Sequence, residues 1–129
     1  MIFGIGTDIA AVSRFGRWAQ SPELLARFFN EAELWRGTAS AHAAWEHYAA
    51  RFAAKEAFAK ALGTGFTGLV LRELWVTKDT LGKPSVALSS AMRALLENRA
   101  GKDARVHLSM SHEKEYAIAY VVIETGEQR

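Results

Sequence analysis

The stretch that decides the fold is SAHAAWEHYAARFAAKEAFAKALG, which runs from Ser40 to Gly63. It is rich in alanine, has no proline or glycine before its last residue, and begins with a serine that can cap a helix. Gly63 can adopt the left-handed backbone that commonly ends a helix. We therefore predict one long helix from Ser40 to Leu62, the strongest element of the chain.

The segments upstream combine a strand with short helices. Residues 1–9 have the composition of a strand, and Gly4 and Gly6 within it indicate a close approach to another backbone. Ser21 and Pro22 are typical of a helix start, because serine caps the first turn and proline suits its first position. The other elements expected here are a short helix over about 10–19 and a helical turn with capping-box spacing at Asn30 and Glu33 that ends at Gly37.

Strands and one helix alternate downstream of the long helix. The expected elements are strands over 69–78 and 84–88, a helix from Ser89 to about Asn98, and a final hairpin of 105–110 and 116–124. Neighbouring strands are joined by short turns, and strands lie before, between and after the helices. This order predicts an α+β fold in which an antiparallel sheet packs against the long central helix, rather than a doubly wound parallel sheet.

Composition limits the classes of protein that remain. The 129 residues, half of them hydrophobic, predict a single domain over 1–129. The chain has no cysteine, which excludes a disulfide scaffold, a thiolate zinc site and a cysteine nucleophile. No apolar run approaches the roughly 18 residues of a membrane span, and the first residues lack the basic start of a signal peptide. We therefore expect a cytoplasmic protein without a membrane partner.

Two carboxylates occupy positions that suggest chemistry. Asp8 ends an apolar, glycine-containing strand, where a charged side chain requires a cation, a hydrogen-bond donor or solvent. Glu56 precedes Lys60 by four residues on the long helix, a spacing that is also typical of an ordinary surface ion pair. Oxygen ligands such as Asp8 and Glu56 suit magnesium, which binds through one or two carboxylates together with water and substrate phosphates.

Two other patterns have simpler interpretations. Residues 63–68, GTGFTG, match a dinucleotide-binding glycine pattern, but they follow a helix instead of a strand. We interpret Gly63 as the helix end, in a loop whose backbone a ligand can approach closely. His42 and His47 are five residues apart, whereas metal-binding pairs on a helix are four apart, so we predict two separate surface histidines.

Several segments, in the same order along the chain, resemble the holo-[acyl-carrier-protein] synthases. They are GIGTDI at 4–9 followed by Arg14, RFAAKEAFAKALGTG at 51–65, GKP at 82–84 and HLSMSHEKEYA at 107–117. The fifteen-residue block together with the segment that contains Asp8 is the most specific part. The resemblance extends from one end of the chain to the other.

The resemblance implies a small, single-domain 4′-phosphopantetheinyl transferase. Such enzymes move the phosphopantetheine arm of coenzyme A to a serine of apo acyl carrier protein and release adenosine 3′,5′-bisphosphate. It further implies Mg²⁺ as cofactor and a role in fatty acid biosynthesis. The family works as a homotrimer whose active sites lie between subunits, so a protomer of 129 residues need not contain a whole cleft.

Roles for individual residues also come from the resemblance. Asp8 and Glu56 match the metal ligands, and Lys60 completes the expected catalytic set by meeting phosphate charge. The acceptor of the serine proton is either Glu56 or a metal-bound water. The expected coenzyme A-binding residues, without an assignment of each cation to a phosphate, are Arg51, Lys55, Gly63, Gly65, Lys83, Pro84 and His112.

The second substrate is an acidic protein, which calls for a basic and apolar docking face. The expected partner-binding residues lie on the two early helices and are Arg14, Arg17, Trp18 and Arg27. Arg14 stands at a family-matched position and is the leading candidate. Its charge can attract an acidic helix of the carrier.

Three other functions are weighed against this one. A nucleic-acid-binding module is suggested by a pI of about 9.1, but a net charge of +2 with both signs interleaved argues against it. An inactive interaction domain on the same fold is disfavoured because Asp8, Glu56 and Lys60 are all present. A transferase for polyketide or peptide-synthase carriers is disfavoured by length, since those enzymes are often longer and fused from two halves.

Overall fold

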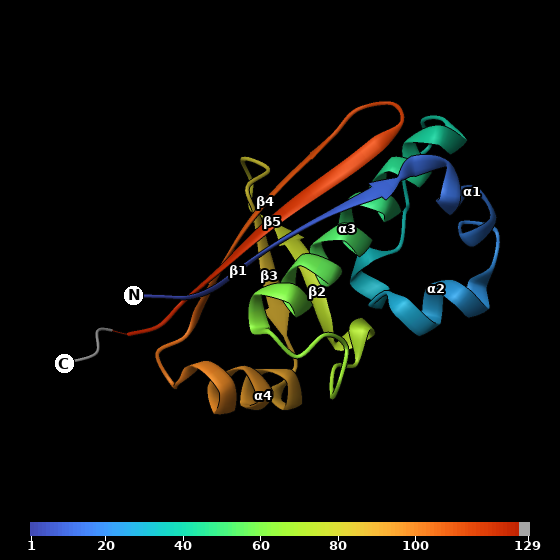
Figure 1. The fold of residues 1–129 in the computed structure, drawn as a ribbon. Helices are drawn as coiled ribbons and strands as arrows, with labels where there is room; N and C mark the ends of the chain where they lie inside the picture. Colours follow the sequence, from blue (N-terminus) through green and yellow to red (C-terminus); the bar gives the residue numbers. More distant parts are fainter. Residues whose placement is uncertain (127–129) are drawn as a thin grey trace.

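The computed structural model describes residues 1–126 and has the predicted α+β architecture (Figure 1). The elements are β1 (Ile2–Ala11), α1 (Phe15–Trp18), α2 (Pro22–Phe28), α3 (Ala41–Leu62), β2 (Leu74–Lys78), β3 (Pro84–Leu88), α4 (Ser90–Ala100), β4 (Arg105–His112) and β5 (Tyr116–Glu124). Three single 3-10 turns are inserted among them: η1 (Val12–Arg14), η2 (Glu31–Glu33) and η3 (Leu71–Glu73).

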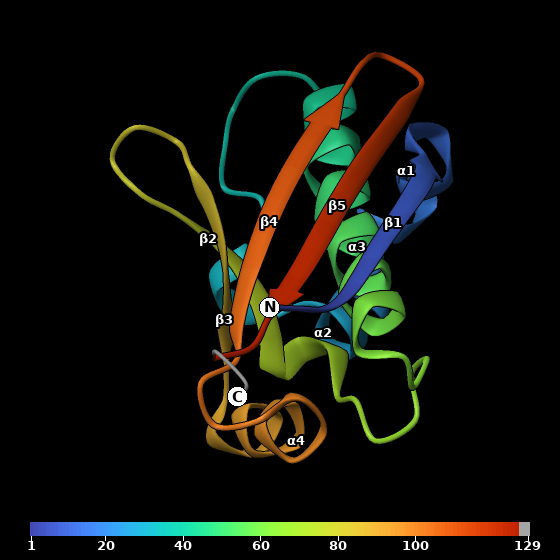
Figure 2. The same cartoon turned by 60° about the vertical axis from the view of Figure 1, so that its left-hand side comes forward.

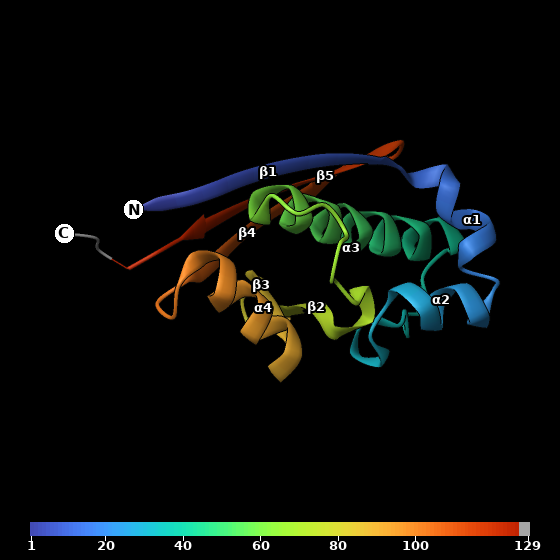
Figure 3. The same cartoon turned by 60° about the horizontal axis from the view of Figure 1, so that its bottom comes forward.

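The main sheet is antiparallel with strand order β1-β5-β4, and a separate hairpin is formed by β2 and β3. Helix α3 packs along one face of the main sheet, as Figure 3 shows, and the hairpin, α2 and α4 lie on the far side of this helix. The opposite face of the sheet is left without a covering helix (Figure 2). The predicted arrangement, an antiparallel sheet against a long central helix, is confirmed.

The ends of α3 follow the predicted signals. The Ser40 hydroxyl oxygen accepts the backbone N–H of Ala43 at 3.1 Å, and Gly63 takes a left-handed φ of 86° at the other end. The N–H of Gly63 donates to Ala59 O, so the helix ends with its last carbonyls partly satisfied. The glycine-rich loop after α3 is therefore a helix terminus, as predicted.

Strand β1 lies unusually close to α3 because of its two glycines. A Cβ atom built on Gly4 would lie 2.0 Å from Ala61 O, and one on Gly6 would lie 2.0 Å from Ala57 O. Only glycine permits such contact between a strand and a helix backbone. The predicted close approach is confirmed, and it brings the inner face of β1 against the C-terminal part of α3.

Several predicted boundaries were wrong. The helix expected over 10–19 is shorter, because β1 continues to Ala11 and pairs there with Tyr116. The strand expected over 69–78 begins only at Leu74, after the turn η3. The capping box of Asn30 and Glu33 is present, but its helix is the single turn η2, which ends at Glu33 rather than near Gly37.

The buried hydrophobic residues form one cluster to which the sheet, α3, α2 and α4 all contribute. Small side chains dominate where α3 meets the sheet: Ala53, Ala57, Ala117 and Ala119 are fully buried. Their size lets the helix and the strands approach closely. Among residues 1–126, no helix has both the length and the apolar character needed to cross a membrane.

Candidate active site

The first group of predicted residues meets where β1 contacts α3. Asp8 is on the inner face of β1, and the close approach of that strand brings its carboxylate near enough to Glu56 on α3 to act on the pKa of that residue. Partial burial, and then the negative charge of Asp8, raise the pKa of Glu56 above its usual value. The two carboxylates are therefore held together against their mutual repulsion.

Lys60 lies one helical turn beyond Glu56, and its ammonium donates to Thr7 O at 2.9 Å and to Asp8 Oδ1 at 3.3 Å. Its side chain remains 56% exposed, so the charge is available to a ligand that enters from solvent. Arg14 also acts on this group, because its positive charge opposes the rise in the pKa of Glu56. The structure thus brings Asp8, Glu56 and Lys60 together, with Arg14 nearby.

The two carboxylates fit a magnesium ion. Within residues 1–126, no group of three or more His, Cys, Asp or Glu side chains could enclose a metal. Magnesium does not need such a group, since it takes one or two carboxylates and completes its octahedral shell with water and substrate phosphates. A divalent cation would also relieve the repulsion between Asp8 and Glu56 that contributes to the raised pKa of Glu56.

Lys55 has a role that the sequence did not predict. Its side chain is completely buried, and its ammonium donates to Glu33 Oε1 at 2.7 Å, Leu71 O at 2.9 Å and Leu74 O at 2.5 Å. Burial lowers the pKa of Lys55, and the negative charge of Glu33 opposes this effect without cancelling it. All three ammonium hydrogens are already used, and Lys55 joins α3 to η2 and β2. The structure thus gives Lys55 a structural role, and its binding of coenzyme A stays a prediction.

A second group of predicted residues lines a cavity of about 570 Å³ on another side of α3. Arg51, Pro84 and His112 are part of it. The predicted Lys83 is exposed at the hairpin but does not line the cavity; Lys78, which pairs with Pro84 across the β2–β3 ladder, does. Sequence reasoning missed Lys78, and the alternation of the two strands was the signal that could have found it.

His47 also lines this cavity, and the prediction of a surface histidine is wrong for it. Its ring packs against those of Trp35 and Tyr48, and burial together with the charge of Arg51 lowers its pKa to about 4. His47 and Arg51 are four residues apart and therefore lie on one face of the helix. This spacing could have predicted that His47 lies beside Arg51. The cavity therefore combines a neutral imidazole with two strong cations.

The two groups face different directions. Arg51 and Glu56 are five residues apart on α3, which corresponds to a rotation of about 140° around the helix axis. The first group belongs to the β1 edge of the sheet, whereas Met110, Ser111 and His112 of β4, at the opposite edge, line the cavity. Gly65, with a φ of 59° and no atom within 4 Å of a Cβ built on it, keeps the loop after α3 open to a ligand.

The predicted docking residues gather on α1, α2 and the turn before them. Trp18 stacks on Phe28 with ring centroids 5.0 Å apart, and the Arg14 guanidinium lies over the rings of Trp18 and Phe52 at 5.3 and 5.0 Å. Arg27 lies over the Phe28 ring at 5.5 Å. The result is an aromatic surface bordered by cations beside Glu56, to which the exposed Arg17 adds charge.

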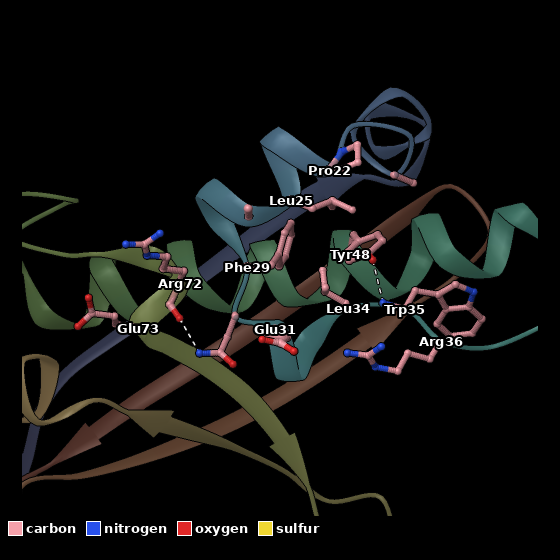
Figure 4. Close-up of a pocket in the computed structure, with 13 residues that line it drawn as sticks. Pro22, Leu25, Phe29, Glu31, Leu34, Trp35, Arg36, Tyr48, Arg72 and Glu73 are labelled. Carbon is pink, nitrogen blue, oxygen red and sulfur yellow. Dashed lines mark hydrogen bonds between the residues drawn. The ribbon is translucent and has the colours of Figure 1, made fainter.

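Another cavity, of about 800 Å³, lies between α2 and residues 30–36 (Figure 4). Its walls are mainly apolar, with Leu25, Phe29 and Tyr48 among them, and none of the predicted site residues lines it. The Tyr48 hydroxyl accepts the N–H of Trp35 at 2.8 Å, so a polar group here serves the chain itself. Size alone does not make this cavity the site, because the clustered carboxylates and cations are elsewhere.

Comparison with known proteins agrees with this geometry. The model of the 4′-phosphopantetheinyl transferase superfamily matches residues 4–121. The holo-[acyl-carrier-protein] synthase of Treponema denticola is 44% identical over 124 residues, covering 96% of this chain and 99% of that protein. The crystal structure of the Neisseria meningitidis holo-[acyl-carrier-protein] synthase is similar with a TM-score of 0.81 and 37% identity, over 97% of this chain and all of that one.

A Bacillus anthracis holo-(acyl-carrier-protein) synthase solved in complex with CoA (3′,5′-ADP) is also similar. Its TM-score is 0.77 and its identity 34%, over 98% of this chain and 99% of that chain. Family match, sequence identity and fold coincide over nearly the full length. The chain belongs to the 4′-phosphopantetheinyl transferase superfamily.

Proposed function

We propose that the protein is a holo-[acyl-carrier-protein] synthase that transfers 4′-phosphopantetheine from coenzyme A to a serine of apo acyl carrier protein. The observation that carries the proposal is the proximity of Asp8 and Glu56, with Lys60 beside them. The relatives named holo-[acyl-carrier-protein] synthase and the solved complex with CoA (3′,5′-ADP) support the same activity. We expect the protein to act in fatty acid biosynthesis in the cytoplasm. We also expect it to form a single domain that spans residues 1–129.

In this reaction the residues mainly position the two substrates and neutralise the charge of the pyrophosphate. The serine oxygen forms a bond to phosphorus of the coenzyme A pyrophosphate, the bond to the bridging oxygen breaks, and adenosine 3′,5′-bisphosphate leaves. Asp8 and Glu56 would hold a magnesium ion, which supplies neutralisation of the pyrophosphate charge. Lys60 adds a mobile cation on the same side, and the serine proton passes to Glu56 or to a water molecule beside it.

Coenzyme A has a second charged region at its 3′-phosphate, and the cavity at the other sheet edge suits it. Arg51 and Lys78 supply cations there, and Pro84 and His112 form part of the wall. A volume of about 570 Å³ is in the range of small-molecule sites. We assign the nucleotide end of coenzyme A to this cavity and the pyrophosphate to Asp8, Glu56 and Lys60.

A homotrimer is proposed because these two half-sites lie at opposite edges of one sheet. The uncovered face of that sheet carries exposed apolar side chains: Ile5 is 71% exposed, Ile9 61%, Tyr116 49% and Tyr120 53%. Exposed apolar side chains on two neighbouring strands are typical of an interface between copies of a chain. Light scattering is expected to give about three times 14.2 kDa, and a fully active monomer would contradict the shared site.

The activity is tested by incubating the protein with coenzyme A, magnesium and apo acyl carrier protein and measuring the intact mass of the carrier. The expected result is the addition of one phosphopantetheine group. A carrier with its attachment serine changed to alanine is the control and gains no mass. An unmodified wild-type carrier would refute the proposal.

A further inference from the structure

His47 contributes a hydrogen-bond acceptor to the cavity at the β4 edge. Its Nε2 atom lies 2.5 Å from Glu33 O. A carbonyl oxygen can only accept, so Nε2 must carry a proton. The backbone of η2 therefore selects the tautomer of this histidine.

The other ring nitrogen is consequently unprotonated at neutral pH. Burial of the ring, and then the charges of Arg51 and Lys78, lower the pKa of His47 to about 4, so the ring carries only the proton on Nε2. Nδ1 then presents a bare lone pair, which accepts hydrogen bonds and cannot donate one.

Nδ1 is also open rather than enclosed. No residue in the described part of the chain donates to it, and no buried side-chain nitrogen or oxygen among residues 1–126 lacks a partner. Nδ1 must therefore be accessible from outside, and His47 lines the cavity. The ring presents an acceptor on the same helix face as Arg51, one turn away.

Building on the proposed function, we propose that Nδ1 of His47 accepts a hydrogen bond from the exocyclic amino group of the adenine of coenzyme A. The cations of the cavity suit the phosphate of the nucleotide, and a neutral imidazole that can only accept suits an N–H donor on the base. His47 is then a specificity-determining residue: it favours a base with an amino group at this position over one with a carbonyl.

Glu46 is the charged competing acceptor in the cavity, which the Ser111 hydroxyl also lines. Its carboxylate lies 3.6 Å from Nδ1 of His112 and 3.9 Å from Nε2 of His42, so it has two imidazole neighbours of its own. His47 has no such second partner. The test must nevertheless distinguish the two residues.

The first probe is the coenzyme A analogue in which hypoxanthine replaces adenine; it exchanges the amino group for a carbonyl oxygen and also turns N1 from an acceptor into a donor. The analogue with unsubstituted purine, which only removes the amino group, is the second probe and shows whether N1 is responsible. Two acceptors would then face each other, and a site built around a substrate N–H rejects such an analogue. For the wild-type protein we expect kcat/KM with coenzyme A to exceed that with the analogue by about 10- to 100-fold.

Three variants locate the source of this preference. His47→Phe removes the acceptor, and its preference is expected to fall to within about threefold of unity, mainly through a loss with coenzyme A. His47→Gln keeps both a donor for Glu33 O and an acceptor, and it is expected to retain most of the preference. His42→Phe is the matched control, since His42 on the same helix also bonds to a backbone carbonyl, that of Lys114, but does not line the cavity.

The preference is a ratio of two rates for one protein sample, so partial unfolding of a variant does not change it. Equal use of both substrates by the wild-type protein would overturn the inference, whether or not His47→Phe folds. An unchanged preference in His47→Phe would also overturn it and would point to Glu46. Failure of the wild-type protein to transfer from coenzyme A itself would instead refute the proposed function.

Discussion

Two lysines of α3, five residues apart, should respond to the same substitution in opposite ways. Lys55 is completely buried and bonded to three oxygens, whereas the side chain of Lys60 is 56% exposed beside Asp8. We expect Lys55→Met to destabilise the fold and Lys60→Met to abolish transfer. The comparison separates a structural cation from one that meets substrate.

The magnitude for Lys55 follows from what its removal leaves behind. Glu33 is 1% exposed and still accepts the N–H groups of Asn30 and Val76, but its carboxylate loses its counter-ion, and the carbonyls of Leu71 and Leu74 lose a donor. Breaking a buried ion pair on one side costs about 3–5 kcal/mol, a large part of the total stability of a small domain. For Lys60→Met, the exposed pair predicts a loss below about 1 kcal/mol.

Urea unfolding followed by circular dichroism measures both losses, and a double variant isolates the pair itself. Because Glu33→Gln removes the stranded charge, we expect it to recover at least about 1 kcal/mol when added to Lys55→Met. Steady-state kinetics on the folded fraction should give an unchanged KM for coenzyme A in Lys55→Met. A stable Lys55→Met protein with a raised KM would refute the reasoning and restore Lys55 to the phosphate site.

Three further outcomes are expected. Asp8→Asn and Glu56→Gln should each lower transfer at least about 100-fold under limiting magnesium with little change in melting temperature; near wild-type turnover would show that the metal site is misassigned. Arg14→Glu should raise the KM for carrier protein about 10-fold and hardly change that for coenzyme A, with a smaller loss at high salt; equal, salt-independent losses would exclude docking. The pKa of His47 is about 4 when folded against 6.5 for the free side chain, so between these values the unfolded chain takes up a proton that the folded protein does not. The free energy of unfolding should therefore fall by up to about 3 kcal/mol on acidification through this window, and pH-dependent urea unfolding of His47→Phe should lack this component.

Local signals predicted most of the elements. The serine cap and Gly63 bound α3 as expected, and Gly4 and Gly6 mark the close approach of β1 to that helix. The short helices were harder to predict, because a single turn such as η2 depends on tertiary contacts more than on propensity. The start of β2 likewise depends on where the Lys55 ammonium holds the backbone of Leu74.

Prediction of the site was limited because the sequence does not show which of its charged side chains are buried. Lys55 and Lys60 belong to the same signature segment, and nothing in their spacing distinguishes a buried lysine from an exposed one. Glu33, the partner of Lys55, is 22 residues away in a turn, so the pair could not be inferred from periodicity. Lys78 was missed although a signal was present: the two predicted strands and the short turn between them place Lys78 opposite Pro84, and both residues line the cavity.

The separation of the half-sites gives the proposed trimer a direct test. Asp8 is on β1 and His112 is on β4, the two outer strands of the sheet in the order β1-β5-β4. If the β1 edge of one subunit meets the β4 edge of the next, the contact is heterologous, and it closes into a ring of three when each subunit is rotated by a third of a turn from the last. Asp8→Asn and Arg51→Gln then disable different halves of each shared site. In trimers assembled at random from equal amounts of the two variants, about a quarter of the interfaces combine two intact halves, so mixing after reversible dissociation should restore up to about a quarter of wild-type activity.

A site contained within one subunit predicts no recovery, because every chain in the mixture carries a defect. Absence of recovery, with mixed trimers verified by native mass spectrometry, would assign both groups of residues to the same chain.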